Sequence, residues 1–464
     1  MRRATSKALE ASSRINVTLP IAARLNRLPI TRIHRTIVII AGIGTFFDLF
    51  DIFLAGVLAT VLTEHFHLSR VSLPAVIGSS FLGMFLGALC LGRFADWVGR
   101  RTAFLVNLGI YSLFTLLGGL STSAAMLVVT RFVAGIGIGA EPPLVDAYLS
   151  EFLPPKHRGR FIAIAYTIGF LGVPAVGFLA RVLVPVHVLG LDGWRWLFVA
   201  GSVGGGIVWF LRNQLPESPR WLESVGRLPE AEAITTQLEA EAVRFGTLSE
   251  PSSNERPAPG SASFAVLFSR EYRGRTAVLW VFQIFQTVGY YGFGTLVPLV
   301  LASKGFSVVT SLTYTSVVFI GYPIGSALSW LVVERIDRRW QIVGSAFLMS
   351  VCGLALGTAA VPAAIIASGL VYTIVSNIFS NAFHIFQAEI FPTFIRATAT
   401  GTAYGLSRLS SAAMPFVLLP VLQQWGAAWM FAAVATAMSI VMVDIGLFAP
   451  STTGRPLEQV ARSL

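Results

Sequence analysis

"GRFADWVGRR" (residues 92–101) lies between two long apolar segments and places an acid one helical turn before a pair of arginines. The stretch "WLVVERIDRR" (330–339) has the same arrangement in the second half of the chain, with Glu334 at the position of Asp96. The match indicates an internal repeat. We call the interval from Asp96 to Glu334 the repeat displacement.

A second pair of loops is separated by the same displacement. "SEFLPPKHRGR" (150–160) carries Glu151, and "AEIFPTFIRAT" (388–398) carries Glu389 at the matching position; an arginine follows each acid after the same interval. Two pairs of loops, each with an acid followed by an arginine, are thus separated by the same repeat displacement. This indicates that the halves of the chain are parallel repeats. Such repeats are typical of transporters whose binding site lies between the halves.

The composition predicts an integral membrane protein. Of the 464 residues, 54% are hydrophobic and only 12% are charged, whereas a soluble domain has about 25% charged residues. Because a membrane-spanning helix needs about 20 mostly apolar residues, twelve spans are predicted. They lie near residues 36–63, 73–94, 102–121, 124–149, 161–184, 194–212, 276–301, 308–333, 341–360, 363–388, 397–421 and 426–449. The expected fold is therefore all-α, with twelve transmembrane helices in two six-helix parallel repeats.

The distribution of basic residues predicts the orientation. With the N-terminus in the cytoplasm, 28 of the 34 Lys and Arg residues lie on the cytoplasmic side, as the positive-inside rule requires. We therefore expect a multi-pass plasma (inner) membrane protein with both termini cytoplasmic. This topology accounts for the net charge of +11 without a nucleic-acid partner. The Arg- and Ser-rich start is also compatible with a transit peptide.

The spans divide the chain into five parts. A central segment separates the two sets of six spans; within it, residues 228–244 are predicted to be helical and residues 249–263, rich in Ser and Pro, to be a linker. The parts are a basic tail (1–35), an N-terminal bundle (36–212), a central cytoplasmic loop (213–275), a C-terminal bundle (276–449) and a cytoplasmic tail (450–464).

The duplicated loops also carry a family resemblance. "GRFADWVGRR" and "RFVAGIGIGAE" (131–141) resemble signatures of the major facilitator superfamily, and the resemblance covers about residues 36–460. "PESPRWL" (216–222) and "PSTTGRPLE" (450–458) resemble its sugar-porter and organic-acid branch. "DLFD" in the first span resembles the Asp-x-x-Asp of proton-coupled aromatic-acid and nicotinate transporters. The resemblance implies a transporter that works by alternating access between its two halves.

Charged residues in the loops are predicted to form a gate. Salt bridges among them would close the cytoplasmic side in one state and break in the other. The alternative is that they only set the topology and are solvated, since an exposed ion pair contributes only about 0–1 kcal/mol; the duplicated spacing favours the gate. The predicted gating residues are Gly92, Asp96, Gly99, Arg100, Arg101, Glu151, Arg158, Arg160, Glu217, Arg220, Glu334, Arg338, Arg339, Glu389 and Arg396.

Two acids lie in the middle of the first span. Asp48 and Asp51 are three residues apart and share a helical face. A carboxylate at the membrane centre costs roughly 2.5–3.5 kcal/mol, so at least one is predicted to act in transport; the alternative is that one anchors a helix or faces water. Proton-coupled sugar porters pair a first-helix acid with a fourth-helix arginine, and the resemblance implies Asp51 and Arg131 in these roles. Asp48 remains the alternative proton carrier, and Glu141 is either a proton relay or a structural residue.

The substrate is expected between the halves, near the membrane midplane. Polar and aromatic residues fall on single helical faces in spans seven and ten, and span eleven carries an arginine suited to a carboxylate. His384 taken alone favours a structural role; as part of the polar face of span ten it is equally consistent with either role. The predicted substrate-binding residues are Gln283, Gln286, Tyr290, Asn377, Asn381, His384 and Arg408.

These features predict a secondary active transporter that symports a small organic acid, aromatic or otherwise carboxylic, with protons. The alternatives are a sugar or polyol porter, proton-coupled or facilitative, and a non-transporting membrane sensor. No nucleophile–base pair, phosphate loop or metal cluster stands out, so an enzyme is not expected. We expect a monomer in the lipid bilayer with a small-molecule substrate, no metal and no cofactor other than the coupling proton.

Overall fold

The computed structural model describes residues 20–244, 248, 264–332, 335–391 and 393–450. Among these residues, twelve helices are long and apolar enough to cross a membrane. The prediction of twelve spans is therefore confirmed. The first span ends earlier than predicted, because the helix breaks at Leu58 and a short separate helix follows.

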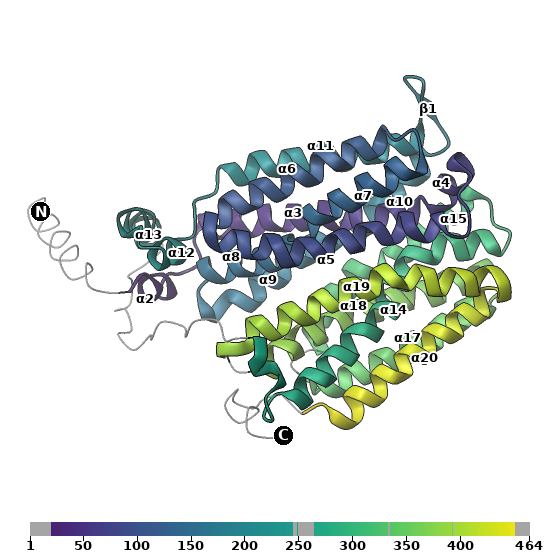
Figure 1. The fold of residues 1–464 in the computed structure, drawn as a ribbon. Coiled ribbons are helices and arrows are strands. Elements are labelled where there is room, and N and C mark those ends of the chain that lie inside the picture. The colour runs from purple at the N-terminus through teal and green to yellow at the C-terminus, as the bar shows by residue number, and fades with distance from the viewer. Residues whose placement is uncertain (1–19, 245–247, 249–263, 333–334, 392, 451–464) are drawn as a thin grey trace, which may run out of the picture.

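The first half of the chain forms one bundle, shown in purple to teal in Figure 1. Several of its spans are broken into two successive helices. The elements are α3 (Arg32–Val57), α4 (Ala59–Phe66), α5 (Ser72–Val98), α6 (Arg100–Gly119), α7 (Ala124–Gly139), α8 (Glu141–Phe152), α9 (Pro155–Phe170), α10 (Gly172–Leu183), β1 (His187–Val188), β2 (Leu191–Asp192) and α11 (Gly193–Asn213).

The second half forms a matching bundle, shown in green to yellow in the same view. Its last span ends in a short π-helical segment, Asp444–Phe448. The other elements are η2 (Phe264–Phe268), α14 (Arg273–Ser303), α15 (Val308–Phe319), α16 (Gly321–Val332), α17 (Arg338–Thr358), α18 (Pro362–Glu389), α19 (Thr393–Trp425) and α20 (Ala427–Val443).

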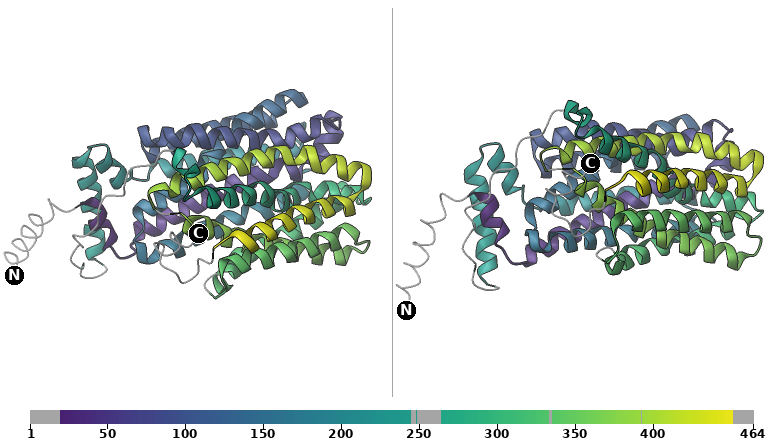
Figure 2. Two further views of the ribbon diagram at one scale, coloured as in Figure 1. Left: turned by 60° about the horizontal axis from the view of Figure 1, so that its bottom comes forward. Right: turned by 90° about the horizontal axis from the view of Figure 1, so that it is seen from below.

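Three short helices lie beyond one end of the first bundle: α2 (Ile21–Asn26), α12 (Pro219–Ser224) and α13 (Leu228–Val243). We call them the platform; they project from the bundle in every view (Figures 1 and 2). The β1–β2 hairpin lies at the opposite end, which we call the hairpin end. α13 confirms the predicted helix in the central segment, and the predicted linker lies outside the described residues.

Within the platform, salt bridges hold α2 against α13. Arg24 and Arg27 donate to Glu239 of α13 at 2.7 and 2.6 Å. Burial alone would raise the pKa of Glu239, but the hydrogen bonds from the two arginines outweigh burial, so the pKa is lowered. The carboxylate therefore stabilises the docked position of α2.

Glycines hold neighbouring spans together in the same way in both halves. A Cβ atom on Gly83 of α5 would meet the carbonyl oxygen of Phe132, and one on Gly87 would meet that of Ile136, both on α7. The second half has these contacts at the matching repeat positions, where Gly321 and Gly325 of α16 lie against backbone atoms of α18. Glycine is required because the helix backbones touch. The internal repeat thus extends from the loops to the helix packing.

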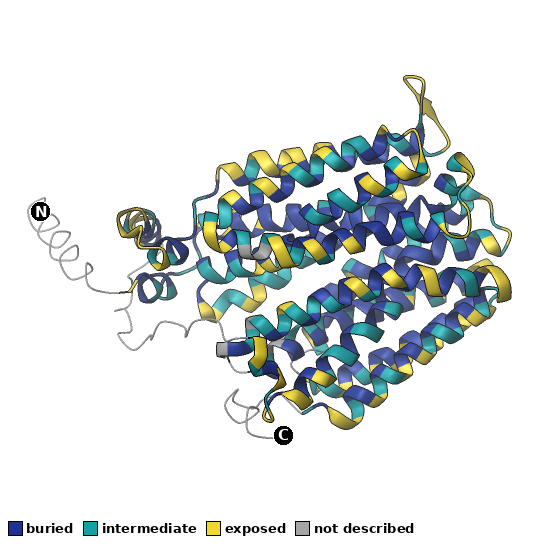
Figure 3. Cartoon of the chain, viewed as in Figure 1, coloured by how far each residue is buried: buried dark blue, intermediate teal, exposed yellow. Residues whose placement is uncertain are grey.

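Exposed residues gather on the outward faces of the bundle, for example along α6 and α11 (Figure 3). Many are large and apolar, including Leu113 on α6 and Val203 and Phe210 on α11. Such an outer surface suits lipid, in which backbone polar groups are satisfied inside each helix.

Candidate transport site

A cavity of about 1250 Å³ lies between the two halves. Its walls come from α3, α8 and α9 of the first half and from α14, α18 and α19 of the second. It extends to the platform end of the bundle, where Arg160, Arg338 and Arg396 line it. This is the position expected for a substrate site between parallel repeats.

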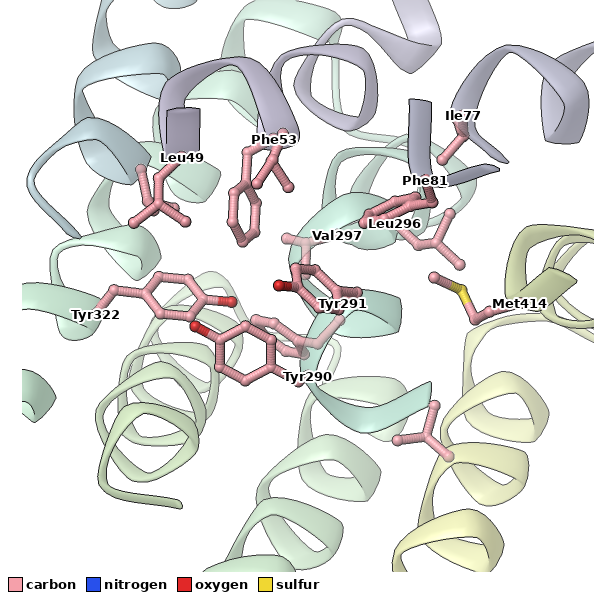
Figure 4. Packing of buried hydrophobic residues seen from close by; sticks show 14 of the residues in the cluster. Leu49, Phe53, Ile77, Phe81, Tyr290, Tyr291, Leu296, Val297, Tyr322 and Met414 are labelled. Atoms are coloured by element: carbon pink, nitrogen blue, oxygen red, sulfur yellow. The ribbon is translucent and has the colours of Figure 1, made fainter. Parts of the chain in front are cut away.

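Aromatic side chains close the cavity toward the hairpin end. Phe53 of α3 lies 5.6 Å from Tyr322 and 6.4 Å from Tyr291, measured between ring centroids. Phe81 of α5 packs on Tyr291 at 5.1 Å, and Tyr290 packs on the same ring at 4.9 Å. Figure 4 shows these rings meeting between the halves. We call these five residues the aromatic plug, because they fill the space through which a solute would pass.

A fully buried ion pair joins α3 to α7. Nη1 of Arg131 lies 2.7 Å from Oδ2 of Asp51, and neither residue is exposed. Nη2 of Arg131 also donates to the backbone oxygen of Asp51 at 2.9 Å and to Ser80 at 3.2 Å. Thr115 donates to Oδ1 of Asp51 at 3.2 Å. The two residues that the family resemblance paired are thus in direct contact.

Asp48 has a different environment, although it lies one turn from Asp51 on the same helix. Asp48 lines the cavity, whereas Asp51 is directed toward α7 and does not line it. A second buried ion pair, between Arg212 of α11 and Glu141 of α8, lies beside Asp48. Arg212 also lies over the ring of Phe104, with Cζ 4.1 Å from the centroid. Glu141 therefore has a structural partner, which the sequence did not identify.

The second half supplies a cation to the cavity. Arg408 of α19 lines it and donates to the hydroxyl oxygens of Tyr291 at 2.7 Å and Tyr404 at 3.1 Å. Within the described part of the chain, no carboxylate lies within 4.0 Å of this guanidinium. Its charge is therefore available to an anionic ligand.

The other predicted substrate residues divide into two groups. Gln286, Tyr290, Asn381 and His384 line the cavity together with Arg408. Gln283 and Asn377 do not, although they lie on the same helices as lining residues. Gln283 is buried and donates to Gln387 at 2.9 Å, and Asn377 donates to the backbone oxygen of Tyr322. These two amides face neighbouring helices, so they hold lining residues in place rather than meeting a ligand.

Among the lining residues that the sequence did not predict are Asp146 of α8 and Tyr166 of α9. The Tyr166 hydroxyl donates to Oδ1 of Asp146 at 3.0 Å. The internal repeat held the signal that identifies them: the repeat displacement takes Asp146 to His384 and Tyr166 to Tyr404, and all four residues line the cavity.

The predicted gating residues of the first half form one network at the platform end. Arg100 binds Asp96 at 2.6 Å and Glu151 at 3.1 Å. Glu217 accepts backbone N–H groups of Arg100 and Arg101 at 2.9 and 3.2 Å, so its carboxylate caps the start of α6. Burial raises the pKa of Glu217, and the N–H groups that it accepts oppose the rise.

Three further residues of the first half that were predicted to gate are located as follows. Arg220 donates to the backbone oxygen of Glu151 at 2.9 Å. Arg158 donates to the backbone oxygen of Leu153 at 3.4 Å, and Arg160 lines the cavity mouth. The ion pairs described here all join residues of the same half, as expected where the cavity reaches this end.

The second half repeats part of this network. Arg338 binds Glu389 at 3.4 Å, and Arg396 donates to the backbone oxygen of Phe391 at 3.2 Å, as Arg158 does to Leu153 at the matching position of the first half. Arg339 donates instead to the backbone oxygen of Gly446. Glu334 lies outside the described residues, and Gly92 lies within α5 in surroundings that are not described.

One departure between the repeats has a structural reason. Gly99 has a φ of +98°, and a Cβ atom there would meet the Glu217 carboxylate. Asp337, its counterpart, has a φ of −57° and caps α17 with its own carboxylate, which accepts the Arg339 N–H at 3.0 Å. Each half therefore caps a helix with a carboxylate, α6 in the first half and α17 in the second. In the first half the carboxylate comes from Glu217, and only glycine at position 99 leaves room for it.

Comparison with known families gives a match over almost the whole chain. Residues 37–464 match the family model "Sugar (and other) transporter". The chain belongs to this family. The protein is a metabolite or sugar transporter of the major facilitator superfamily and is not an enzyme.

Named relatives of this transporter include proteins for small metabolites. It is 35% identical to the metabolite transport protein YyaJ of Bacillus subtilis (strain 168), over 84% of this chain and 86% of that protein. It is 28% identical to the niacin transporter NiaP of Acinetobacter baylyi, over 95% and 100%. It is 27% identical to a gallate transporter of Pseudomonas putida, over 83% and 85%.

A solved structure with the same fold is the partially occluded inward-open conformation of the xylose transporter XylE from Escherichia coli. It superimposes on this transporter with a TM-score of 0.74 at 21% sequence identity, covering 91% of this chain and 99% of XylE. This likeness confirms the major facilitator fold predicted from the duplicated loops.

Proposed function

We propose that this transporter takes up a small organic acid, aromatic or otherwise carboxylic, together with protons, by alternating access of the cavity. One observation carries the coupling: Asp51 and Arg131 form an ion pair with no exposure beside the cavity wall. A buried carboxylate is ionised only while its partner cation is close. Movement of α7 away from α3 would therefore favour proton uptake by Asp51.

The consequence of proton uptake follows from electrostatics. Breaking a buried pair leaves an uncompensated charge, which costs roughly 3–5 kcal/mol. A proton on Asp51 neutralises the carboxylate and weakens its bond to Arg131, so α3 and α7 can shift against each other within the first half at a lower cost. Asp48, which faces the cavity, is the route by which a proton from the cavity reaches this region, and it remains the alternative carrier.

The substrate class rests on Arg408. A guanidinium in a cavity wall, unpaired with any described carboxylate, suits a carboxylate ligand through two parallel hydrogen bonds. The rings of Tyr290, Tyr291 and His384 around it suit an aromatic or hydrocarbon body. The niacin and gallate transporters among the relatives carry aromatic carboxylic acids by name, which supports this class.

The alternative, a sugar or polyol porter, has its own support. The family model is named for sugar transport, and the amides of Gln286 and Asn381 line the cavity. Amide groups bind hydroxyls well. However, Gln283 and Asn377 do not line the cavity, and Arg408, which does, is better suited to a carboxylate than to a hydroxyl.

Uptake into proteoliposomes tests the proposal. With an inward proton gradient, we expect labelled aromatic carboxylates to accumulate above equilibrium, and a protonophore to abolish the accumulation. Labelled xylose and a polyol serve as the comparison substrates. Accumulation of the sugars but not of the acids would contradict the substrate class. Ligand binding without flux of any compound would indicate a sensor.

A further inference from the structure

Away from the platform end, the two walls of the cavity carry opposite charges; Glu389 of the second-half wall lies at that end and pairs with Arg338. On the first-half wall lie the carboxylates of Asp48 and Asp146; on the second-half wall lies the guanidinium of Arg408, with His384 nearby. The basic residues Arg160, Arg338 and Arg396 lie farther out, at the platform end. A ligand between the walls thus meets an acid on one side and a base on the other.

Asp146 differs from Asp51 and Glu141, the two acids of the first half that are buried in ion pairs with arginine. Asp51 and Glu141 each contact an arginine, whereas Asp146 has no arginine or lysine within 4.0 Å among the described residues. It is exposed although it lies inside the bundle, and it lines the cavity, so its carboxylate opens into that space. Its hydrogen bond from the Tyr166 hydroxyl reaches only Oδ1. Oδ2 is left for a ligand.

Aromatic rings connect Asp146 to Arg408 across the cavity. The ring of Tyr166 faces that of His384 at 6.4 Å and 24°, which is the point where the path crosses between the halves. His384 lies 6.2 Å from Tyr404, and Cζ of Arg408 lies 4.8 Å from the Tyr404 centroid. These rings line the space between the acid and the guanidinium, so a flat ligand that binds Arg408 and lies along them extends toward Asp146.

We propose that the transported acid is dipolar: its carboxylate binds Arg408, and a protonated amine or another N–H donor at its far end binds Oδ2 of Asp146. This inference rests on the proposed function and narrows its substrate class. A carboxylic acid without an N–H donor at its far end would form no hydrogen bond with Asp146, so the carboxylates of the first-half wall would not raise its affinity. A dipolar acid gains a charge-assisted hydrogen bond to Asp146. The transporter should therefore bind a dipolar acid more tightly than a plain carboxylate, and this difference of affinities is its selectivity.

Matched pairs of probes test the inference on the purified wild-type transporter. The pairs are 4-(aminomethyl)benzoate with 4-methylbenzoate, and their 3-substituted isomers, which differ in one ammonium group. Isothermal titration calorimetry should show the aminomethyl compound of at least one pair binding about tenfold or more tightly than its methyl partner, as expected for one charge-assisted hydrogen bond. Equal binding, or tighter binding of the methyl compounds, would overturn the inference.

The variant Asp146→Asn identifies the residue responsible. We expect it to lose most of the preference for the aminomethyl compound over the methyl compound. Asp444→Asn is the matched control, because Asp444 is a buried acid of the last span that does not line the cavity; it should keep the preference. A preference unchanged in a folded Asp146→Asn protein would assign the amine to another group and overturn the proposal.

The failures of the two proposals are distinguishable. If both compounds of each pair bind equally and are accumulated, the proposed function stands and only the dipolar inference fails. If none of the carboxylates binds, both fail. Since the wild-type comparison needs no variant, a misfolded Asp146→Asn protein leaves the decision intact.

Discussion

Arg131 holds Asp51 at two points, because one guanidinium nitrogen lies 2.7 Å from the side-chain Oδ2 and the other 2.9 Å from the backbone oxygen of the same residue. This double contact fixes α3 against α7 within the first half. The side-chain contact depends on the charge of Asp51, whereas the backbone contact does not. Protonation would therefore weaken the link without removing it, as a reversible coupling step requires.

The first prediction concerns Asp51→Asn. The amide cannot lose a proton, so we expect proteoliposomes with this variant to exchange labelled for unlabelled substrate but not to accumulate it against a gradient. The matched control is Thr115→Val, which removes a hydrogen bond to Asp51 at 3.2 Å but keeps its charge; it should still accumulate substrate. Accumulation by Asp51→Asn equal to wild type would assign coupling elsewhere, with Asp48 as the next candidate.

The second prediction concerns Arg408. Replacement by alanine should weaken carboxylate binding by about tenfold to a hundredfold, the loss expected for a hydrogen bond to a charged group. Calorimetry with benzoate measures it. Tyr404→Phe removes only one of the arginine's hydrogen-bond partners and should have a smaller effect. Benzoate affinity unchanged in Arg408→Ala would remove the support for an anionic substrate.

The third prediction concerns the close packing of α5 against α7. A Cβ atom on Gly139 would meet backbone atoms of Met84, so Gly139→Ala should lower stability by about 1–3 kcal/mol through overpacking. A Cβ atom on Gly109 of α6 would meet no neighbouring atom within 4 Å, so Gly109→Ala is the control. It should leave stability equal or raise it by about 0.5–1 kcal/mol. Thermal unfolding in detergent measures both, and an unfolding temperature of Gly139→Ala at or above that of wild type would contradict the packing argument.

The fourth prediction concerns pH and the platform. The pKa of Glu239 is lowered in the folded state below its ordinary value of 4.5, so its stabilising effect is present above pH 4.5. The effect is lost as the pH falls through the lowered pKa, because the protonated acid no longer binds Arg24 and Arg27 as an anion. Protease cleavage in the segment before α3 should therefore increase at acid pH.

Glu239→Gln provides the comparison for this pH effect. Its platform should be cleaved faster at neutral pH, with little further change on acidification. Glu230→Gln is the control, since Glu230 lies on the same helix and pairs only with Arg227 on an exposed surface. If wild type and Glu239→Gln show the same pH profile, the charge of Glu239 does not hold α2 in place.

Much of the site could be predicted from the sequence, but not the direction in which each side chain points. Asp48 and Asp51 share a helical face, yet one lines the cavity and the other binds Arg131. Gln283 and Gln286 likewise share a face, and only Gln286 lines the cavity. Side chains three residues apart diverge enough for neighbouring helices to separate them, and those neighbours are distant in the sequence.

Asp146 shows the opposite case, because the sequence contains the information that identifies it as a lining residue. The repeat displacement already matched loops 92–101 and 330–339, and it also pairs Asp146 with His384. Because the halves are related by an internal repeat, a residue predicted to line the cavity in one half makes the matching position in the other half a candidate for lining it. The repeat is thus a guide to the site as well as to the fold.

By itself the sequence determined the twelve spans, the two parallel halves and the positions of charge within the membrane, because hydropathy and an internal repeat are properties of local segments. Only the tertiary structure decided which acids meet arginines, which open into the cavity and which aromatic rings close it. Those outcomes depend on contacts between helices that are far apart in the chain, where a modest rotation of one helix moves a carboxylate from a salt bridge to a cavity wall.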